Sequence, residues 1–350
     1  MAGRTTSPAI HVPLARASTR ARMPARSTYL VTGGCGFIGS HLADRLIALG
    51  HRVRVLDNLS TGRLANLSDG AELVVGDVAD EATVHDALRD VDGCFHLAAA
   101  ASVARCNADA ILTNRINLVG TLTILATAAR RAIPVVYASS AAVYGANPST
   151  PLGEMSETRP LSVYAADKLA CELHAAVASH LHRVPTVGLR FFNVYGPRQD
   201  PASPYSGVIS IFADRLARGQ ELTVYGDGAQ VRDFVFVGDV VDVIVAAMAR
   251  QQPGAFVCNV CTGEGTTILA LTKVLADLTG VRAEIRHAPA RAGDVRISIG
   301  DPRRLADAYG RVPTTTLREG LRELLGPRVA ARRSTAPNEI FIAAPEASRP

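Results

Sequence analysis

Tryptophan is absent from this chain of 350 residues, and aromatic residues make up only 5% of it. A core must therefore consist mainly of Ala, Val, Leu and Ile, and a hydrophobic content of 48% is enough for a large one. No uninterrupted apolar run reaches the roughly 18–20 residues that span a bilayer, so we expect no membrane partner. The length predicts one large domain with a smaller lobe.

Cysteine is scarce, and its spacing shows no disulfide framework. The six cysteines lie in apolar surroundings, at Cys35, Cys94, Cys106, Cys171, Cys258 and Cys261. This excludes a disulfide scaffold and predicts a reducing, cytoplasmic location. The last two form a C-x-x-C pair, but a zinc site needs two further ligands and no matching second pair exists. We therefore expect no metal site.

Acidic residues are missing from residues 1–27, which contain five arginines. Setting these aside leaves 32 basic against 32 acidic residues, so the net charge of +5 indicates no basic face and no nucleic-acid partner. An Arg-, Ser- and Thr-rich segment is typical of an organelle transit peptide. It also fits a start annotated too early, with Met23 as the true first residue, or a disordered extension, which we favour.

Apolar strand-like runs alternate with helix-period runs from Tyr29 to Phe191. This alternation predicts an α/β fold with a Rossmann-type, doubly wound parallel sheet. The predicted strands are Tyr29–Thr32, Arg52–Leu56, Glu72–Val75, Gly93–Leu97, Val135–Ala138 and Thr186–Phe191. The predicted helices are His41–Leu49, Ala82–Leu88, Ile111–Arg131 and Tyr164–His182.

The pattern loosens after residue 192, where three prolines mark a long loop. We assign residues 28–192 to the Rossmann domain, with 236–254 returning to it, and residues 193–325 mainly to a smaller C-terminal α/β lobe that binds substrate. The segment 326–350 has no sustained periodicity, and we expect a disordered tail.

A glycine-rich loop, TGGCGFIGS, follows the first strand and opens the first helix. Gly33, Gly36 and Gly39 let the backbone approach a pyrophosphate, which the helix N-terminus attracts. Asp57 ends the next strand, where a carboxylate accepts hydrogen bonds from both ribose hydroxyls and repels a 2′-phosphate. The loop therefore predicts NAD rather than NADP, although Arg63 could soften that preference.

Lysine is nearly absent, since it occurs only at Lys168 and Lys273. Lys168 follows Tyr164 by one helical turn, so both lie on one helix face. An ordinary tyrosine is a poor base at neutral pH because its pKa is about 10 and its hydroxyl stays protonated. Lowering that pKa to about 7 requires roughly 4 kcal/mol of preferential stabilisation of the phenolate. One ammonium about 4 Å away supplies about that at an effective dielectric of about 20. The pair predicts hydride and proton chemistry on an alcohol.

The loop spacing and the Tyr-x-x-x-Lys pair together resemble the extended short-chain dehydrogenase/reductase superfamily, and within it the NAD-dependent epimerase/dehydratase family. The resemblance runs from about Ser27 to Leu325 and includes GDV at 76–78, HLAA at 96–99 and N-x-x-G-T at 117–121. It implies that Ser140, after the strand at 135–138, binds the substrate oxygen and relays its proton. The cofactor residues it implies are Gly33, Gly36, Phe37, Ile38, Gly39, Asp57, Asn58, Asp77, Val78, Leu97, Ala98, Ala99, Asn117, Tyr164, Lys168 and Phe191.

The residues before V-Y-G separate the reactions of this family. Related 4,6-dehydratases carry an Asp-Glu pair there, and decarboxylases carry a Glu. Here Ala141 and Ala142 stand at these positions, so the resemblance implies epimerisation at C4 through a transient 4-keto sugar. Asp167 and Ala100–Ala101 depart from the family pattern and temper the choice of substrate.

Three later segments resemble the nucleotide-sugar-binding segments of UDP-glucose 4-epimerase-type proteins: LRFFNVYGPRQD, VRDFVFV and RAGDVR. A diphosphate suits arginine, which forms charge-assisted, bidentate bonds to it. Ser298 stands where a bulky aromatic would admit only plain hexoses, so UDP-N-acetylglucosamine is allowed beside UDP-glucose and UDP-galactose. The implied substrate residues are Ser140, Tyr164, Asn193, Tyr225, Arg232, Arg291, Asp294 and Ser298.

The resemblance also implies a homodimer packed through the helices near 111–131 and 164–182. Two other functions stay open: another nucleotide-sugar enzyme, such as a uronate epimerase, a 3,5-epimerase-reductase, a decarboxylase or a dehydratase, or a non-catalytic RNA- or protein-binding member. An intact Tyr-Lys-Ser set argues against the second, because a binding module has no need of it.

Overall fold

The structure is a computed structural model that describes residues 26–201, 207–251, 254–291 and 293–333, with side chains of the last helix described up to Gly326. The extensions predicted to be disordered fall largely at 1–25 and 334–350, outside the described residues. Ser27 is already buried, and its carbonyl accepts a hydrogen bond from the Arg52 amide.

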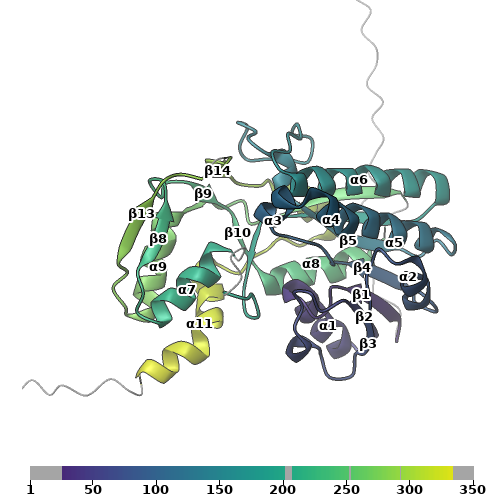
Figure 1. Cartoon of the computed structure of the whole chain (residues 1–350), viewed down its shortest axis with the longest axis horizontal. Helices are drawn as coiled ribbons and strands as arrows, with labels where there is room; N and C mark the ends of the chain where they lie inside the picture. Colours follow the sequence, from purple (N-terminus) through teal and green to yellow (C-terminus); the bar gives the residue numbers. More distant parts are fainter. Residues whose placement is uncertain (1–25, 202–206, 252–253, 292, 334–350) are drawn as a thin grey trace, which may run out of the picture.

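A parallel seven-stranded sheet forms the centre of the large domain (Figure 1). Its strand order is β11-β6-β5-β4-β1-β2-β3, and every neighbouring pair is parallel. This confirms the predicted Rossmann-type fold. The strands are β1 (Thr28–Thr32), β2 (Arg52–Asp57), β3 (Glu72–Val75), β4 (Gly93–His96), β5 (Val135–Ser140), β6 (Thr186–Phe191) and β11 (Ala255–Val260).

Helices cover both faces of this sheet, with a separate core on each face (Figure 1). α1 (Phe37–Ala48) and α8 (Val237–Ala249) pack together on one face, while α2 (Glu81–Ala87), α5 (Gly120–Ala129) and α6 (Val163–His182) lie on the other. In β1, Tyr29 and Val31 join the first core and Leu30 joins the second. Such two-sided burial is expected of strands in a parallel sheet.

α6 is a helix of 20 residues whose sequence suits packing against the sheet. The Ser162 side chain caps its first turn by accepting a hydrogen bond from the Ala165 amide. Its buried residues recur at helical spacing and include Lys168, Cys171, Glu172 and Ala175. The helix therefore presents Lys168 and Glu172 to the protein interior.

The segment 110–129 is helical through α4 (Ala110–Asn114), the π-helical turn η2 (Arg115–Val119) and α5. It is the one helix in the described ranges that is long and apolar enough to cross a membrane. The sequence contains no uninterrupted apolar run of that length, and the helix packs against α2 and α6. A core helix passes the same test, so this feature is weak evidence of a membrane span.

The smaller lobe is built after residue 192 from short pairings, β7 with β10, β8 with β13, and β9 between β12 and β14. Its elements are β7 (Asn193–Tyr195), α7 (Val208–Ala217), β8 (Leu222–Tyr225), β9 (Val231–Arg232), β10 (Phe234–Phe236), β12 (Thr266–Thr267), α9 (Ile268–Thr279), β13 (Ile285–Ala288), β14 (Ile297–Ser298) and α11 (Leu317–Arg333). α10 (Arg303–Tyr309) packs on β11 and α8.

Two boundaries differ from the sequence pattern. The return to the large domain is predicted at 236–254, whereas it also includes β11 and reaches Val260. The disordered tail is predicted from residue 326, whereas residues 326–333 belong to α11, which continues to Arg333. Its inner turns are anchored by the buried side chains of Leu321 and Leu325, a local packing effect that composition does not reveal.

Candidate functional site

A crevice is expected beside the carboxyl ends of β1 and β4. β1 lies between β2 and β4 in the sheet, so the chain order reverses at this point. Ligands of open parallel sheets bind at such a switch point. The glycine-rich loop leaves β1 here, and the HLAA segment leaves β4. The residues predicted to bind the cofactor therefore lie together at one edge of the sheet.

The glycine loop is too crowded for side chains at its predicted glycines. Gly33 has φ +70°, and a Cβ there would meet the Ala98 backbone at 2.9 Å. A Cβ on Gly39 would come within 2.2 Å of the Gly33 carbonyl oxygen, and one on Gly36 within 3.1 Å. The loop thus brings β1, the start of α1 and the segment after β4 into backbone contact.

The start of α1 is suited to an anion. Its N-cap is Gly36, which offers no side-chain hydrogen bond, and its first turn, which includes Phe37 and Ile38, contains no acidic residue. The free amides and the positive end of the helix therefore face no competing protein group of their own turn. Such a loop fits the pyrophosphate of a dinucleotide, as the spacing predicts.

Asp57 lies at the end of β2 with its side chain buried. One of its carboxylate oxygens accepts from the Cys35 amide at 2.9 Å, and the other from the Leu59 amide at 2.8 Å. These two bonds tie the carboxylate to the glycine loop and leave acceptor positions for ribose hydroxyls. The geometry suits the ribose role predicted for Asp57.

The other predicted cofactor residues lie around the same edge. Asp77 accepts from the Ala79 amide and shapes the turn after β3, while Val78 is buried against Gly120. The amides of Leu97 and Ala98 donate to Thr32 Oγ1, which holds the HLAA segment to the end of β1. Ala99 is half-buried in the same segment, Asn58 is exposed after β2, and Phe191 is buried at the end of β6.

His96 connects this edge to the π-helical turn. Its Nδ1 lies 2.8 Å from Thr32 Oγ1 and its Nε2 lies 3.1 Å from Thr121 Oγ1. Thr121 donates its own proton to the Asn117 carbonyl, so it must accept from His96 Nε2–H. Burial, assisted by the charge of Lys168, lowers the pKa of His96 to about 3. The imidazole is therefore neutral and carries its proton on Nε2.

The predicted catalytic residues come from two elements that pack together. Tyr164 lies in the first turn of α6, and the Lys168 ammonium one turn later is 5.9 Å from the centroid of its ring. Lys168 is only 3% exposed. Ser140 ends β5 and caps η3 (Ala141–Tyr144), and both of these elements contact α6.

Asn117 and Asp167 form a buried clamp beside this site. The Asn117 side chain accepts from the Ala100 amide at 2.8 Å and donates to the Ala100 carbonyl at 3.3 Å. Its amide group also donates to Asp167, which accepts a second bond from Asn114 at 2.9 Å. Asp167 therefore faces two amide donors, and Asn117, predicted as a cofactor residue, ties the segment after β4 to α6 through Ala100 and Asp167.

The predicted substrate residues lie in the smaller lobe and at its junction. Arg232 forms an ion pair with Asp294, and Arg291 stacks on Tyr225 with its guanidinium carbon 3.9 Å from the ring centroid. Ser298 pairs with Arg232 in the β9–β14 register. A sixth such residue, Asn193, is exposed at the start of β7, and its backbone amide donates to the carbonyl of Asp233, the neighbour of Arg232 in the sequence.

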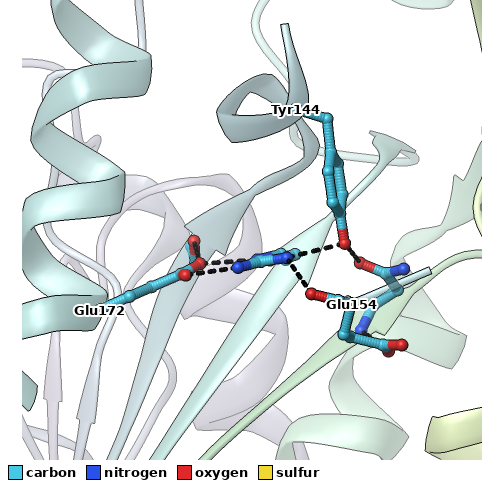
Figure 2. A network of polar contacts seen from close by, with 6 residues as sticks. Tyr144, Glu154 and Glu172 are labelled. Atoms are coloured by element: carbon cyan, nitrogen blue, oxygen red, sulfur yellow. Dashed lines mark hydrogen bonds and ion pairs between the residues drawn. The ribbon is translucent and has the colours of Figure 1, made fainter. Parts of the chain in front are cut away.

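A buried polar network lies between α6 and the sheet (Figure 2), and none of its residues was predicted as a site residue. Arg190 and Glu172 form an ion pair with both side chains 7% exposed. Tyr144, Ser139, Asn259 and Glu154 complete the network. The sequence signal is Arg190 itself, a charged residue inside the apolar strand TVGLRF, where an unpaired charge would be costly.

All six cysteines are buried and free, so the C-x-x-C pair forms no disulfide. Within the described part of the chain, no group of three or more His, Cys, Asp or Glu side chains could hold a metal ion.

Comparisons with known proteins agree with this geometry. Residues 29–261 match the model of the NAD dependent epimerase/dehydratase family. A UDP-glucose 4-epimerase of Mycolicibacterium smegmatis is 41% identical over 302 residues, covering 83% of this chain and 95% of the relative. More distant relatives include a UDP-N-acetyl-alpha-D-glucosaminuronate decarboxylase of Bacillus cytotoxicus, 32% identical over 268 residues that cover 74% of this chain and 83% of the relative.

Solved structures show the same fold. A UDP-glucose 4-epimerase of Thermotoga maritima, crystallised with UDP-glucose, superimposes with a TM-score of 0.83 at 37% identity and covers 88% of this chain and 99% of its own. A Thermus thermophilus UDP-glucose 4-epimerase in complex with NAD has a TM-score of 0.80 at 37% identity, covering 88% and 100%.

Proposed function

The chain belongs to the NAD-dependent epimerase/dehydratase family, and from this premise we propose that it inverts the C4 stereocentre of a nucleotide-diphosphate sugar, with NAD as its cofactor. The observation that carries the proposal is the pair on α6: a buried Lys168 ammonium beside the ring of Tyr164, on a helix that packs against the strand ending in Ser140. This pair is built to move a proton on an alcohol.

The roles of the residues follow from their chemistry. NAD, when bound, supplies the hydride acceptor and, on the return step, the hydride donor. Tyr164 accepts the proton of the sugar 4-hydroxyl and later returns it, and the Lys168 ammonium stabilises negative charge on the phenol oxygen. Ser140 hydrogen-bonds the same sugar oxygen and relays its proton. The 4-keto sugar is then reduced from its other face, so no net oxidation results.

The residues after Ser140 favour epimerisation over elimination. Ala141 and Ala142 supply neither a proton donor nor an acceptor, and η3 places them directly beside the catalytic strand. Loss of water from a 4-keto sugar needs a general acid and a general base. Relatives named decarboxylases share 32% identity or more, so the assay below includes a uronate substrate.

For the substrate we propose a UDP-linked hexose, UDP-glucose or UDP-galactose, or their N-acetyl forms. Arg232 and Arg291 bind the diphosphate, Asn193 donates to a phosphate oxygen, and Tyr225 stacks on the base. Arg232 and Asp294 already pair with each other, so ribose and diphosphate would be held by one preformed unit. The serine hydroxyl of Ser298, half-buried on β14, leaves more room than an aromatic ring for a 2-substituent.

A homodimer is the assembly that we propose. Leu173, Val177 and Leu181 form a stripe at i, i+4 and i+8 on α6 and are 63%, 51% and 63% exposed. On the helix beside it, Ile111 is 89% exposed. Two adjacent helices with apolar outer faces are self-complementary in a two-fold dimer.

One experiment separates the reactions. The protein is incubated with UDP-glucose, UDP-galactose, their N-acetyl forms and UDP-glucuronate, and the configuration at C4 is followed by NMR without added reductant. Inversion with no net NADH supports the proposal. A 4-keto-6-deoxy sugar or a pentose product overturns it.

Tyr164→Phe tests the assigned base. The variant retains the ring but lacks the hydroxyl that exchanges the proton, so we expect turnover to fall by at least about 100-fold. Bound NAD, released by denaturation and quantified, should stay at the wild-type level. Turnover that persists at the wild-type rate would show that another group is the base.

A further inference from the structure

We propose that Glu172 is a positioning residue that fixes the catalytic helix relative to the strand carrying Ser140. Both oxygens of its buried carboxylate are engaged: Ser139 Oγ donates at 2.5 Å, while Arg190 donates through Nε at 2.8 Å and Nη2 at 2.7 Å. The inference rests on the proposed function, because its consequence is the placement of the Tyr164–Lys168 pair.

Three polar residues of this network, Ser139, Arg190 and Asn259, lie side by side on neighbouring strands of the sheet. Ser139 pairs with Arg190 in the β5–β6 register, and Arg190 pairs with Asn259 in the β6–β11 register. Side chains in such a row project from the same face of a parallel sheet. α6 packs on these strands, so Glu172 bonds directly to the side chains from β5 and β6 and reaches Asn259 on β11 through Arg190 and Tyr144.

Glu172 is also in phase with the catalytic pair. It follows Lys168 by four residues and Tyr164 by eight, so all three lie along one face of α6. At about 1.5 Å per residue, the carboxylate lies only about 12 Å along the axis from the phenol-bearing turn. Any slip or rotation of α6 at Glu172 would therefore move Tyr164 with it.

The strand end of this contact is equally direct. Ser139 immediately precedes Ser140, so the hydrogen bond from Ser139 holds to the helix the very turn that presents the catalytic hydroxyl. The carboxylate bridges the strand that carries one catalytic group and the helix that carries the other two. Stability alone does not require this arrangement, since apolar side chains of similar volume often replace buried ion pairs without loss.

The network continues from Arg190 toward the substrate lobe (Figure 2). Arg190 Nη1 donates to the Tyr144 hydroxyl at 2.8 Å, and Tyr144 donates to Asn259 Oδ1 at 2.7 Å. Asn259 Nδ2 in turn donates to the Leu152 carbonyl at 2.8 Å.

The last step reaches the segment after Ser298. The Leu152 amide donates to the Ile299 carbonyl at 2.8 Å, and the Asp301 amide donates to the Leu152 carbonyl at 2.9 Å. Glu172 thus stands at the end of a continuous chain of hydrogen bonds between the catalytic helix and the proposed sugar pocket.

Ser139→Ala is the sharpest test, because it removes one hydroxyl and keeps the ion pair. A displacement of about 1 Å at a reacting group can cost about 100-fold, so we expect kcat to fall about tenfold for a smaller shift. KM should change less than about twofold, since the diphosphate and base contacts lie in the other lobe.

Ser179→Ala is the matched control. It removes a buried serine hydroxyl from the far end of α6, but Ser179 Oγ has no hydrogen-bond partner within the part of the chain described by the structure. Its kcat should equal that of the wild type. If Ser139→Ala keeps wild-type kcat, or if both variants lose activity equally, the positioning role is refuted.

Glu172→Gln provides the second arm. In a double-mutant cycle with Ser139→Ala, the two losses of kcat should be clearly less than multiplicative, because both substitutions weaken the same contact, one by removing its hydroxyl donor and the other by removing the negative charge of its acceptor. Multiplicative losses would show that the residues act independently and would overturn the inference. Should Glu172→Gln fail to fold with Arg190 left unpaired, Ser139→Ala still decides the question.

Failure of the proposed reaction would look different. If the wild-type protein does not invert C4, the same variants are compared by the rate at which bound NAD is reduced by any sugar nucleotide that the protein oxidises. A tenfold loss in Ser139→Ala, with none in Ser179→Ala, would then support the positioning role while the epimerase proposal falls. Equal rates would refute the role itself.

Discussion

At the scale of single residues, Lys168 is a buried cation in a chain that otherwise uses arginine almost throughout. Arginine is planar, always charged and needs room for five donors, whereas lysine is a compact point charge. Lys168 is 3% exposed and lies against the Tyr164 ring. A compact ammonium fits this space, which explains why lysine persists here.

Lys168→Arg should therefore lower turnover by at least about 100-fold even though the charge is conserved. The wider guanidinium group would displace the Tyr164 ring, and misplaced reacting groups lose about that factor in rate. Turnover is measured by the same NMR assay. Lys273→Arg is the matched control, since Lys273 is exposed on α9 and should tolerate the change. Near-wild-type activity of Lys168→Arg would mean that only the charge matters.

His96 makes folding sensitive to acid. Its folded pKa is about 3, lowered by burial and by Lys168, whereas an unfolded histidine has a pKa of about 6.5. Between these pH values the unfolded chain binds a proton that the folded chain does not. The contribution of His96 to the free energy of unfolding is therefore fully present above pH about 6.5 and is lost as pH falls toward 3.

His96→Gln should remove this dependence. From pH about 7 to about 5, the wild type should lose about 2 kcal/mol more free energy of unfolding than the variant, because the histidine term is absent from the latter. Urea unfolding at the two pH values measures the difference. Equal losses in both proteins would show that His96 titrates normally in the folded state.

At the scale of elements, the glycine loop depends on close backbone contact between β1 and α1. Gly39→Ala would place a methyl group 2.2 Å from the Gly33 carbonyl oxygen, a clash with backbone that no rotamer relieves. We expect α1 to shift away from the loop, with loss of bound NAD and a lower melting temperature. Cofactor content and thermal unfolding measure both effects.

Gly326→Ala is a suitable control for that substitution. Gly326 lies inside α11, and a Cβ there would meet nothing within 4 Å. Alanine is favoured over glycine in a helix by up to about 1 kcal/mol, so this variant should be unchanged or slightly more stable. Retention of NAD at the wild-type level in Gly39→Ala would mean that the loop does not form the cofactor contact.

Local patterns were sufficient to predict six of the seven strands of the sheet, the glycine loop and the Tyr164–Lys168 pair, but not β11. In each case the signal lies within one turn, one strand or one strand–helix unit. The Asp167 clamp and the Glu172 network could not be predicted in this way, because they join residues such as Asn114 and Asp167 that lie 53 positions apart. Their only trace in the sequence is polar or charged residues within otherwise buried elements.

At the scale of the whole molecule, the outer faces of α6 and of the neighbouring α4 expose apolar side chains. The exposed stripe of Leu173, Val177 and Leu181 is too regular to be explained by isolated surface residues, and it lies opposite the buried face that carries Lys168 and Glu172. A contiguous apolar patch of this kind marks an interaction site. In the proposed dimer, a second copy of the chain would bury this stripe and leave the buried face of α6 in contact with the sheet.

Leu173→Arg combined with Leu181→Arg should convert the proposed dimer to a monomer, because like charges would meet across a two-fold axis while losing apolar contact. Light scattering coupled to size exclusion gives the mass directly. Leu64→Arg is the control, since Leu64 is 60% exposed on the short helix η1 (Leu64–Asn66), away from α6. A wild-type protein that is monomeric at high concentration, or a double variant that keeps the wild-type dimer mass, would contradict this assembly.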